Sequence, residues 1–453
     1  TETQAAACEG ILQLYEKAFE TRTTQCCALV GPAGSGKTSV VTNHLIPLLH
    51  SYAPDLIVSA FTHRAVSVLT AKLAAQGLDS IEHCTAASLL GYRETHRYKD
   101  RPPEFTKERE GRAREFRIIF VGDDAQLPPV GHPSGEPIPA FDSASMPVFV
   151  LNEVLRSAGP ITRFANAIRN APPERCLRRI TQEKLDEGEG ITMHAHQGEM
   201  RDAVEATMAD VIRNGGFNDQ FRVLCFTNAR ADWWNKICRS QEFGDESAPF
   251  RRGELLLNRN PLFNPEAEDI GRRSCLPYVG NCTDLEVIST PEPSRWRLGE
   301  FDYATWRFEV KAAHKDEPIL VYVPDPDDLD RVQSEAKALR KEAGAAGKWE
   351  LASSKAQETF DVKALQKLGK KRPRDRAGAL WNTYFTIQRV LLHGLSPRYS
   401  TTVHKSQGGE WSTVFVDHGD ITKLKLYKKH NEFQSCLYTA VSRAREELHF
   451  SMM

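Results

Sequence analysis

The eight residues 31–38, with the sequence GPAGSGKT, constrain this 453-residue chain more than any other stretch. A short apolar run at residues 25–30 precedes them, and apolar side chains recur at helical spacing over residues 39–46. A strand, a glycine-rich loop and a helix in this order are typical of a phosphate-binding P-loop, in which backbone N–H groups surround a triphosphate. Lys37 would reach the β and γ phosphates and the Thr38 hydroxyl would ligate Mg²⁺. A purely structural glycine turn is the alternative, and the flanking strand and helix disfavour it.

Composition indicates a globular protein of about two to four domains. Charged residues make up 26% and hydrophobic residues 40% of the chain, and no apolar run approaches the roughly 18 residues of a membrane helix. The N-terminus has no secretory signal, so we expect a cytoplasmic or nuclear protein that is not secreted and has no membrane partner. A net charge of −1 neither predicts nor excludes nucleic-acid binding. The ten scattered cysteines favour reduced, buried thiols over a zinc site.

Polar residues follow two further apolar runs that we expect to be parallel strands. Residues 55–61 lead into Thr-His-Arg at residues 62–64, and residues 116–121 lead into Gly-Asp with Gln126 close behind. Loops at the carboxyl ends of parallel strands share one edge of the sheet, where ligands bind. The alternatives are a helix cap at residue 62 and a structural turn at the Pro-Pro pair, residues 128–129.

A second half with a similar alternation of strand-like and helical segments begins near residue 151. This alternation changes between residues 251 and 392. That interval has short strand-like runs and a charged helical stretch, whose mixed charges favour a solvated surface over a nucleic-acid patch.

Three side chains are ambiguous in isolation. Gln4, one helix ahead of the P-loop, could read the polar edge of adenine. Taken alone, Gln4, Arg156 and Arg443 are each more often ordinary exposed residues.

Taken in order, these stretches resemble the motifs of superfamily 1 helicases, most closely the RecD-like and phage Dda-like branch, which moves 5′ to 3′. The matching positions span almost the whole chain: Gln4, 31–38, 62–65, 122–129, Arg156, 402–410 and 438–445. The resemblance implies an α/β fold with two RecA-like P-loop domains, a small inserted β-rich accessory domain and a helical charged segment. It places the first RecA-like domain at 1–150, with a short wedge at about 91–115, the second at 151–250 and 393–453, and the inserted domain at 251–392.

The resemblance implies an ATP-dependent DNA helicase or translocase that moves on single-stranded DNA and unwinds duplex DNA. ATP and Mg²⁺ would be its cofactors, and single-stranded and fork DNA its partners. The alternative is a hydrolysis-deficient protein of the same fold that binds ATP and single-stranded DNA as a binding module. A small P-loop kinase would leave the second α/β half without a purpose.

The resemblance also assigns roles to individual residues. The catalytic positions are Lys37, Thr38, Gln126, Arg156 and Arg443; Gln126 would sense the γ-phosphate, and the arginines would stabilise charge during phosphoryl transfer. The nucleotide-binding positions are Gln4, Gly31, Gly34, Ser35, Gly36, Lys37, Thr38, Ser39, Gly408 and Glu410, with Thr38 as the magnesium ligand. The nucleic-acid-binding positions are Phe61, Thr62, His63, Arg64, Thr402, His404 and Lys405. Phe61 or Trp411 could stack a base, although burial in the core is favoured for both.

One departure from the family concerns hydrolysis. Superfamily 1 helicases carry an Asp-Glu pair at the end of a strand between the residue 62 and residue 122 motifs, and the interval 91–116 contains neither such a pair nor another apolar strand. Asp100, in a polar loop, is a poor substitute. We expect that this sequence omits a segment, as its start at Thr1 rather than Met also suggests. Loss of a central strand should break the hydrogen-bond ladder of the sheet, whereas the other nucleotide-site positions are intact.

Overall fold

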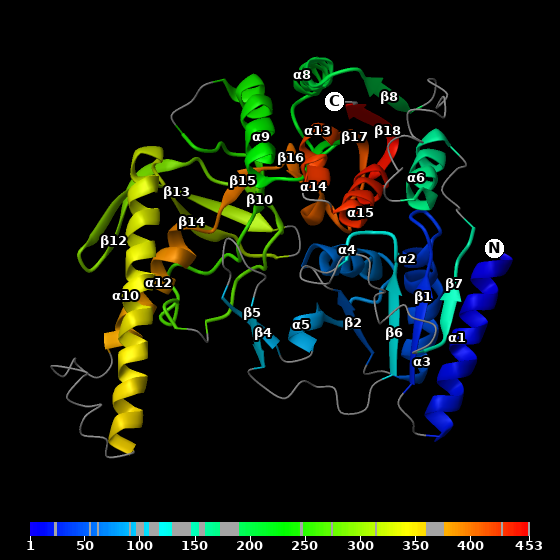
Figure 1. The fold of residues 1–453 in the computed structure, drawn as a ribbon, viewed down its shortest axis with the longest axis horizontal. Helices are drawn as coiled ribbons and strands as arrows, with labels where there is room; N and C mark the ends of the chain where they lie inside the picture. The colour runs from blue at the N-terminus through cyan, green and yellow to red at the C-terminus, as the bar shows by residue number, and fades with distance from the viewer. Residues whose placement is uncertain are drawn as a thin grey trace. The chain divides into compact units, whose positions relative to one another are not determined.

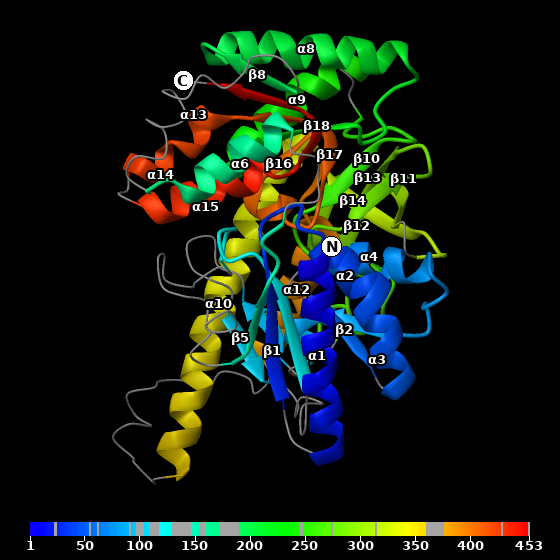
Figure 2. The same cartoon turned by 90° about the vertical axis from the view of Figure 1, so that its right-hand side faces the viewer.

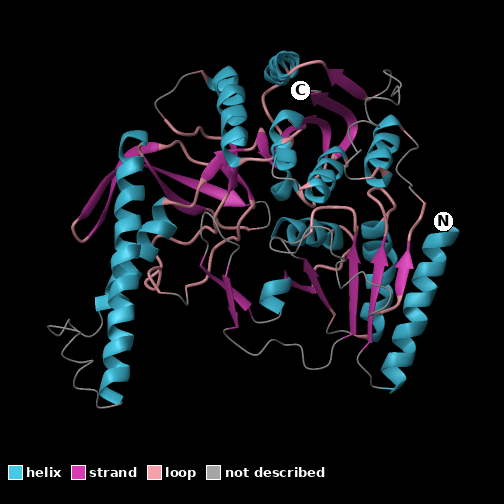
Figure 3. Cartoon of the chain, viewed as in Figure 1, coloured by secondary structure: helices cyan, strands magenta, loops and turns pink. Residues whose placement is uncertain are grey.

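The structure, a computed structural model, divides into two compact units. It describes all residues except 22–24, 54–55, 61–62, 90–91, 97–103, 108–116, 129–145, 154–158, 173–189, 245–247, 273–274, 313–314, 359–375, 427–428 and 452–453. One unit comprises Thr1–Gly244 and Arg398–Met453, and the other comprises Asp245–Pro397, which contains the predicted insertion at 251–392. Helices and strands are mixed throughout (Figure 3). Within the described residues no helix is long and apolar enough to span a membrane.

The P-loop strand β1 (Gln25–Val30) is the centre of a parallel sheet of order β6-β1-β7 (Figure 1). Its neighbours are β6 (Arg117–Gly122) and β7 (Val148–Val150). The helix α1 (Glu2–Thr21) covers this sheet because Ile11 and Tyr15 fall on one helix face and pack into the same cluster as Cys27 and Leu29 of β1. Helix α1 therefore holds the N-terminal residues next to the P-loop strand.

The helix after the P-loop has one widened turn. It runs as α2 (Lys37–Val40), a π turn (Val41–Leu45) and α3 (Ile46–Tyr52). Pro47 at the start of α3 has no N–H to donate, and its ring would clash with the carbonyl of the preceding turn in a regular α-helix. A π turn opens the backbone at that position and keeps the helix continuous.

A second, separate parallel sheet contains β2 (Ile57–Ala60) and β3 (Glu82–Thr85), which α4 (His63–Ala74) connects. After α5 (Ala86–Leu89), the predicted excursion contains the antiparallel hairpin of β4 (Tyr92–His96) and β5 (Glu104–Lys107). Among the described strands, neither β2 nor β3 pairs with β6. Among these strands the hydrogen-bond ladder is interrupted between β3 and β6. We refer to α1 through β7 as the P-loop half.

The second half is built on a five-stranded parallel sheet of order β16-β9-β17-β18-β8. The strands are β8 (Ile191–His194), β9 (Phe221–Cys225), β16 (Ser400–Thr402), β17 (Trp411–Val416) and β18 (Ala444–Ser451). The helices are α6 (Pro160–Asn170), α8 (Gln197–Arg213), α9 (Asn228–Phe243), α13 (His418–Ile421), α14 (Lys423–Leu426) and α15 (His430–Val441). Helices α6 and α15 pack on one face of the sheet, whereas α8 and α9 pack on the other (Figure 2). This sheet between two helical layers confirms the predicted α/β class.

The second unit is a curled antiparallel sheet of order β12-β13-β11-β10-β15, with β14 paired to β13. Its strands are β10 (Leu255–Asn258), β11 (Asp284–Val287), β12 (Glu292–Leu298), β13 (Phe301–Ala312), β14 (Ile319–Pro324) and β15 (Leu395–Pro397). Along β13 the buried positions change from Tyr303 and Thr305 to Phe308 and Val310, so the strand turns its other face inward. The long α10 (Pro326–Glu358) and α12 (Arg376–Leu391) complete the unit. It corresponds to the predicted β-rich accessory domain with a charged helical segment.

Candidate nucleotide site and nucleic-acid interface

The P-loop needs glycine at three positions for steric reasons. Gly34 and Gly36 have φ angles of 80° and 79°, a left-handed conformation that other residues adopt only with strain. A Cβ on Gly31 would lie 2.7 Å from the carbonyl oxygen of Leu151 and 2.7 Å from Ser35 Oγ, so no side chain fits there. The loop therefore turns tightly into the first turn of α2, whose free N–H groups form an anion site.

Lys37 concentrates positive charge in a largely buried position. Its Nζ donates to the carbonyl oxygens of Gly31 and Pro32, both at 2.7 Å. Burial lowers the pKa of this ammonium group to about 8; Asp123 opposes the shift, and the positive charges of Arg169 and Arg443 add to it. Two arginines and the carboxylates of Asp123 and Asp124 therefore lie within electrostatic range of Lys37.

The side chains around Lys37 fit a nucleoside triphosphate. Ser35 Oγ is completely buried and has no hydrogen-bond partner among the described residues, so it is available to a phosphate oxygen. Thr38 is half-buried in the first turn of α2, where its hydroxyl can serve a phosphate-bound Mg²⁺, and Ser39 is exposed. Within the described part of the chain no group of three His, Cys, Asp or Glu side chains could hold a metal ion. Magnesium ligation by Thr38 remains a prediction.

Gln4 lies against the P-loop, as its predicted role requires. Its Nε2 donates to the carbonyl oxygen of Ser35 at 3.1 Å, and its Oε1 accepts from the ammonium group of Thr1 at 3.1 Å. The packing of α1 on β1 brings this amide to the loop from a distance of 31 residues in sequence. Adenine recognition by Gln4 remains a prediction.

Gln126 belongs to a loop organised by the carboxylate of Asp123. We call residues 123–127 the sensor loop. Asp123 Oδ1 accepts from the backbone N–H of Ala125, and Oδ2 accepts from Gln126 Nε2, both at 3.2 Å. The Asp123 side chain is almost fully buried, and Arg169 Nη1 lies 3.7 Å from its Oδ1. The orientation of the Gln126 amide thus depends on Asp123.

Besides Arg169 of α6, three side chains of the second half contact the sensor loop. The hydroxyl of Tyr438 donates to Asp123 Oδ2 at 2.8 Å, and Thr439 Oγ1 accepts from the backbone N–H of Leu127 at 3.1 Å. Gln407 Nε2 donates to the carbonyl oxygen of Leu127 at 2.9 Å. Helix α15 and the turn after β16 therefore both hold the loop that carries Gln126.

Arg443 is buried and holds the backbone of the second half. Its Nε donates to the carbonyl oxygen of Thr439 at 3.0 Å, and its Nη1 donates to that of Gly409 at 3.2 Å. Its charge nevertheless lowers the pKa of Lys37, so it lies within electrostatic range of the P-loop. Glu410 is exposed and lies 3.5 Å from Arg445.

Gly408 lies against the start of α4 in the P-loop half. It has a φ angle of 86°, and a Cβ built on it would be 3.4 Å from Cα of Ala65. Glycine is therefore favoured by its backbone conformation, and it permits close approach of the turn after β16 to α4.

The predicted DNA contacts of the second half lie on the turn after β16. Thr402 is buried at the end of that strand, and Val403–Ser406 forms a 3₁₀ turn. Lys405 Nζ donates to Asn228 Oδ1 at 2.9 Å. The ring of His404 lies 5.9 Å from that of Phe226, and burial lowers the His404 pKa, which leaves a neutral imidazole at neutral pH. Lys405 is therefore the cation of this turn.

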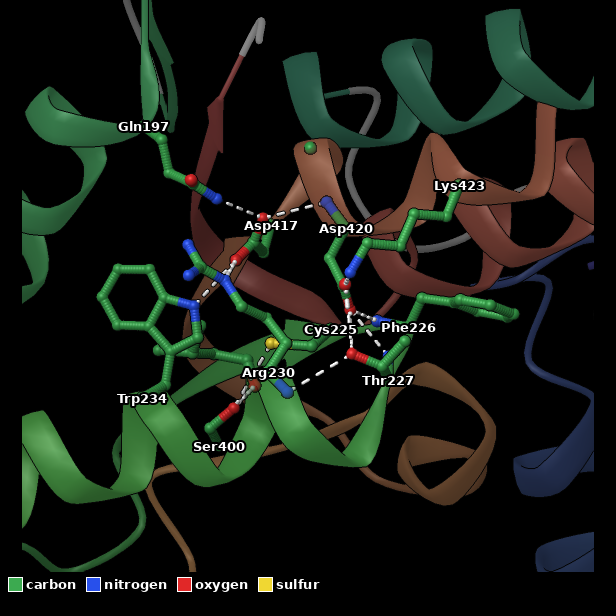
Figure 4. A network of polar contacts seen from close by, with 12 residues as sticks. Gln197, Cys225, Phe226, Thr227, Arg230, Trp234, Ser400, Asp417, Asp420 and Lys423 are labelled. Atoms are coloured by element: carbon green, nitrogen blue, oxygen red, sulfur yellow. Dashed lines mark hydrogen bonds and ion pairs between the residues drawn. The ribbon is translucent and has the colours of Figure 1, made fainter. Parts of the chain in front are cut away.

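Two buried aspartates fix the neighbouring turn between β9 and α9 (Figure 4). Asp420 Oδ2 accepts from the backbone N–H groups of Phe226 and Thr227 at 2.8 and 2.6 Å. Asp417 Oδ2 accepts from Arg230 Nε at 2.6 Å and from Trp234 Nε1 at 2.8 Å. Asn228, the partner of Lys405, is the first residue of α9 and therefore follows a rigidly held turn.

Five of the predicted positions have no described side chain. Phe61, Thr62 and Arg156 lie outside the described residues, and His63 and Arg64 begin α4 without described side chains. Base stacking by Trp411 is wrong, and the favoured alternative of burial is confirmed. Trp411 is only 2% exposed, with its ring 4.7 Å from the guanidinium group of Arg222.

Sequence reasoning missed five residues that the fold brings to the site. These are Asp123, Arg169, Asn228, Gln407 and Tyr438. Asp123, Gln407 and Tyr438 lie inside the stretches that carry the family resemblance, so position in sequence was an available signal. Gln407 and Tyr438 bind residues hundreds of positions away in the sequence, and no local pattern identifies such contacts.

Comparisons with known proteins cover both halves. A family model described as "UvrD-like helicase C-terminal domain" matches residues 397–451, and one described as "AAA domain" matches residues 12–189. The chain is 24% identical over 455 residues to "ATP-dependent DNA helicase dda" of Enterobacteria phage T4, with 93% of each protein covered.

Two solved structures also align with the chain. Pif1 helicase from Candida albicans is 14% identical, with a TM-score of 0.38 and coverage of 100% of this chain and 94% of that one. Bacteroides Pif1 bound to ssDNA is 12% identical, with a TM-score of 0.41 and coverage of 96% and 90%.

Proposed function

We propose that this chain, a homologue of the Dda-like superfamily 1 helicases, is an ATP-dependent motor that moves 5′ to 3′ on single-stranded DNA and unwinds forks. The observation that carries the proposal is the hydrogen bond from Gln407 to Leu127. It joins the turn that holds Lys405 to the loop that holds Gln126. A motor requires such a connection, because DNA contacts and nucleotide contacts must change together.

The proposed nucleotide site uses side chains from both halves. Gly34, Gly36 and Lys37 would bind the phosphates, with Gly31 and Ser35 shaping the loop, and ATP bound there would supply the free energy of the cycle. Thr38 would ligate Mg²⁺, Gln4 would contact adenine, and Gln126 would respond to the γ-phosphate. Arg443 and Arg156 would contribute positive charge from the second half, with Gly408 and Glu410 beside them.

The proposed DNA track uses contacts that do not depend on base sequence. Lys405 supplies a charged donor, and Thr402, His404, Thr62, His63 and Arg64 supply further polar groups for phosphate contacts. Phe61 would stack a base. The hairpin of β4 and β5 would form the wedge that separates the strands of a fork.

Single-strand-stimulated ATP hydrolysis tests the proposal. We expect hydrolysis that rises with single-stranded DNA, and loss of that activity in Lys37→Ala. Lys72→Ala, at an exposed position of α4, is the matched control and should retain it. Binding of ATP and DNA without ATP hydrolysis would instead identify the hydrolysis-deficient binding module. This is the principal alternative, because the Asp-Glu pair is absent from the sequence and the sheet of the P-loop half is divided.

Direction requires a separate measurement. We expect unwinding of a fork with a 5′ single-stranded tail and little unwinding of a duplex with only a 3′ tail. The reverse preference would place the chain in the other superfamily 1 branch.

A further inference from the structure

The hydroxyl of Tyr438 connects the P-loop to the sensor loop. It accepts from the backbone N–H of Ala33 at 2.8 Å and donates to Asp123 Oδ2 at 2.8 Å. A phenol has one proton, and a carboxylate can only accept, so the direction of both bonds is fixed. The side chain is 1% exposed on α15, which holds it rigidly in the second half.

The same carboxylate oxygen of Asp123 also receives the Gln126 amide. Gln126 Nε2 lies 3.2 Å from Asp123 Oδ2, so Tyr438 and Gln126 share one acceptor. A chain of hydrogen bonds therefore runs from Ala33 in the P-loop through Tyr438 and Asp123 to Gln126. The Tyr438 hydroxyl is thus the acceptor of the Ala33 N–H and a donor to the carboxylate that orients Gln126, and its loss would remove both bonds.

This chain is buried and close to charge. Burial raises the pKa of Tyr438, and the nearby Asp123 carboxylate raises it further, so the hydroxyl stays protonated and continues to donate. Ala33, Tyr438 and Ser442 also line one small pocket, which places the ring at the edge of open space beside the P-loop. Lys37 contacts other atoms of the loop, Gly31 and Pro32, and does not depend on the hydroxyl.

We propose that Tyr438 is a positioning residue for recognition of the terminal phosphate of a nucleoside triphosphate. It acts through Asp123 and Ala33, which set the Gln126 amide relative to the P-loop. The inference rests on the nucleotide site of the proposed function, although it does not require DNA unwinding. Loss of the hydroxyl weakens triphosphate binding and leaves diphosphate binding intact, because Gly36 and Lys37 are unchanged.

The experiment compares Tyr438→Phe with the intact chain by titration of two fluorescent nucleotides with Mg²⁺: a non-hydrolysable ATP analogue and ADP. We expect the affinity for the triphosphate to fall about tenfold and that for the diphosphate to change less than about twofold. Tyr399→Phe is the matched control, since it removes another buried hydroxyl of the second half, bonded to Glu242 at 2.6 Å. In Tyr399→Phe the ratio of triphosphate to diphosphate affinity should be the same as in the intact chain. The proposal is overturned if Tyr438→Phe loses affinity for both nucleotides equally. It is also overturned if both affinities match those of the intact chain.

A double variant tests the route through Gln126. Gln126→Ala should reduce triphosphate affinity on its own, and adding Tyr438→Phe should cause no further loss, because both changes break the same chain. Fully additive losses would show that Tyr438 acts elsewhere. If Tyr438→Phe does not fold, Asp123→Asn removes the shared acceptor and should give the same selective loss. If the intact chain prefers the triphosphate but unwinds no fork, the proposed function is refuted and the role of Tyr438 is not.

Discussion

The side-chain amide of Gln407 donates to the backbone carbonyl oxygen of Leu127 across 2.9 Å, although 280 residues separate them in sequence. Gln407 follows the 3₁₀ turn of His404 and Lys405, and Leu127 ends the loop of Gln126. Thr439 holds the backbone N–H of the same leucine. The second half thus binds both the backbone N–H and the backbone carbonyl oxygen of Leu127, so a movement of one half relative to the other would displace the sensor loop.

Gln407→Ala should separate DNA binding from nucleotide turnover. One hydrogen bond is worth about 1 kcal/mol, so we expect stimulation of ATP hydrolysis by single-stranded DNA to fall roughly five- to tenfold, with nucleotide affinity nearly unchanged. Gln197→Ala is the control, because Gln197 donates to Asp417 within the second half, at 2.8 Å. Full stimulation in Gln407→Ala would show that coupling runs through other contacts.

Nucleotide affinity should decrease in alkaline solution. The Lys37 pKa is lowered to about 8, so the ammonium charge is present below pH 8 and is lost as the pH rises through that value. Titration of a fluorescent ATP analogue should show about a tenfold weaker affinity at pH 9 than at pH 7. Arginine does not deprotonate in this range, so Lys37→Arg should show a flat profile whatever its absolute affinity. A profile for the intact chain as flat as that of Lys37→Arg would contradict the assignment.

Acid should destabilise the second unit through His393. Burial lowers the His393 pKa from 6.5 to about 4, although its Nε2 donates to the carbonyl oxygen of Tyr322 at 2.9 Å. The unfolded chain therefore binds the proton more readily, and the stability contribution present above pH 6.5 is lost as the pH falls toward 4. We expect the unfolding free energy to fall by about 2 kcal/mol between pH 7 and pH 5, measured by denaturant titration.

Two variants isolate that effect. His393→Gln cannot titrate and should lose this part of the pH dependence, even if it is less stable at pH 7. His44→Gln replaces an exposed histidine and should keep it. Equal slopes for the intact chain and His393→Gln would exclude His393 as the source.

Asp219→Ala should strongly destabilise the second half. Its carboxylate accepts from the completely buried Arg222, from Arg398 Nη2 at 2.5 Å and from Trp411 Nε1 at 3.2 Å. Removing it takes their carboxylate partner away from two buried arginines, at a cost of about 3–5 kcal/mol. The control is Asp210→Ala, which breaks the exposed pair with Arg213 and should change the unfolding midpoint far less. Similar losses of stability in both variants would contradict the conclusion that burial makes the ion pairs of Asp219 more important than the exposed pair of Asp210.

The elements that could be predicted from sequence are those specified locally. The P-loop follows from its glycines, whose φ angles of 80° and 79° no other residue adopts easily. The buried strand β9 follows from a short apolar run that only Arg222 interrupts. Gln4 could be placed one helix ahead of the P-loop, because an amphipathic helix packing on β1 brings its N-terminus there.

The remainder depends on tertiary contacts that leave no local pattern. Tyr438 reads as another apolar position of α15, and its hydroxyl partners lie 405 and 315 residues away. Arg169 ends a strongly amphipathic helix, where an arginine is ordinary, and only the fold places it beside Asp124 at 2.5 Å. The buried environment that neutralises His404 is likewise a property of the packed turn.

The divided sheet of the P-loop half has a consequence for solubility. Among the described strands β6 pairs with β1 on one side only, and Val121 on β6 is 41% exposed. An open edge of this kind presents unpaired backbone donors and acceptors together with apolar surface, which is a template for strand addition by another molecule. Where that edge stays unpaired, the protein should self-associate as its concentration rises, and a strand that paired with β6 would suppress the association.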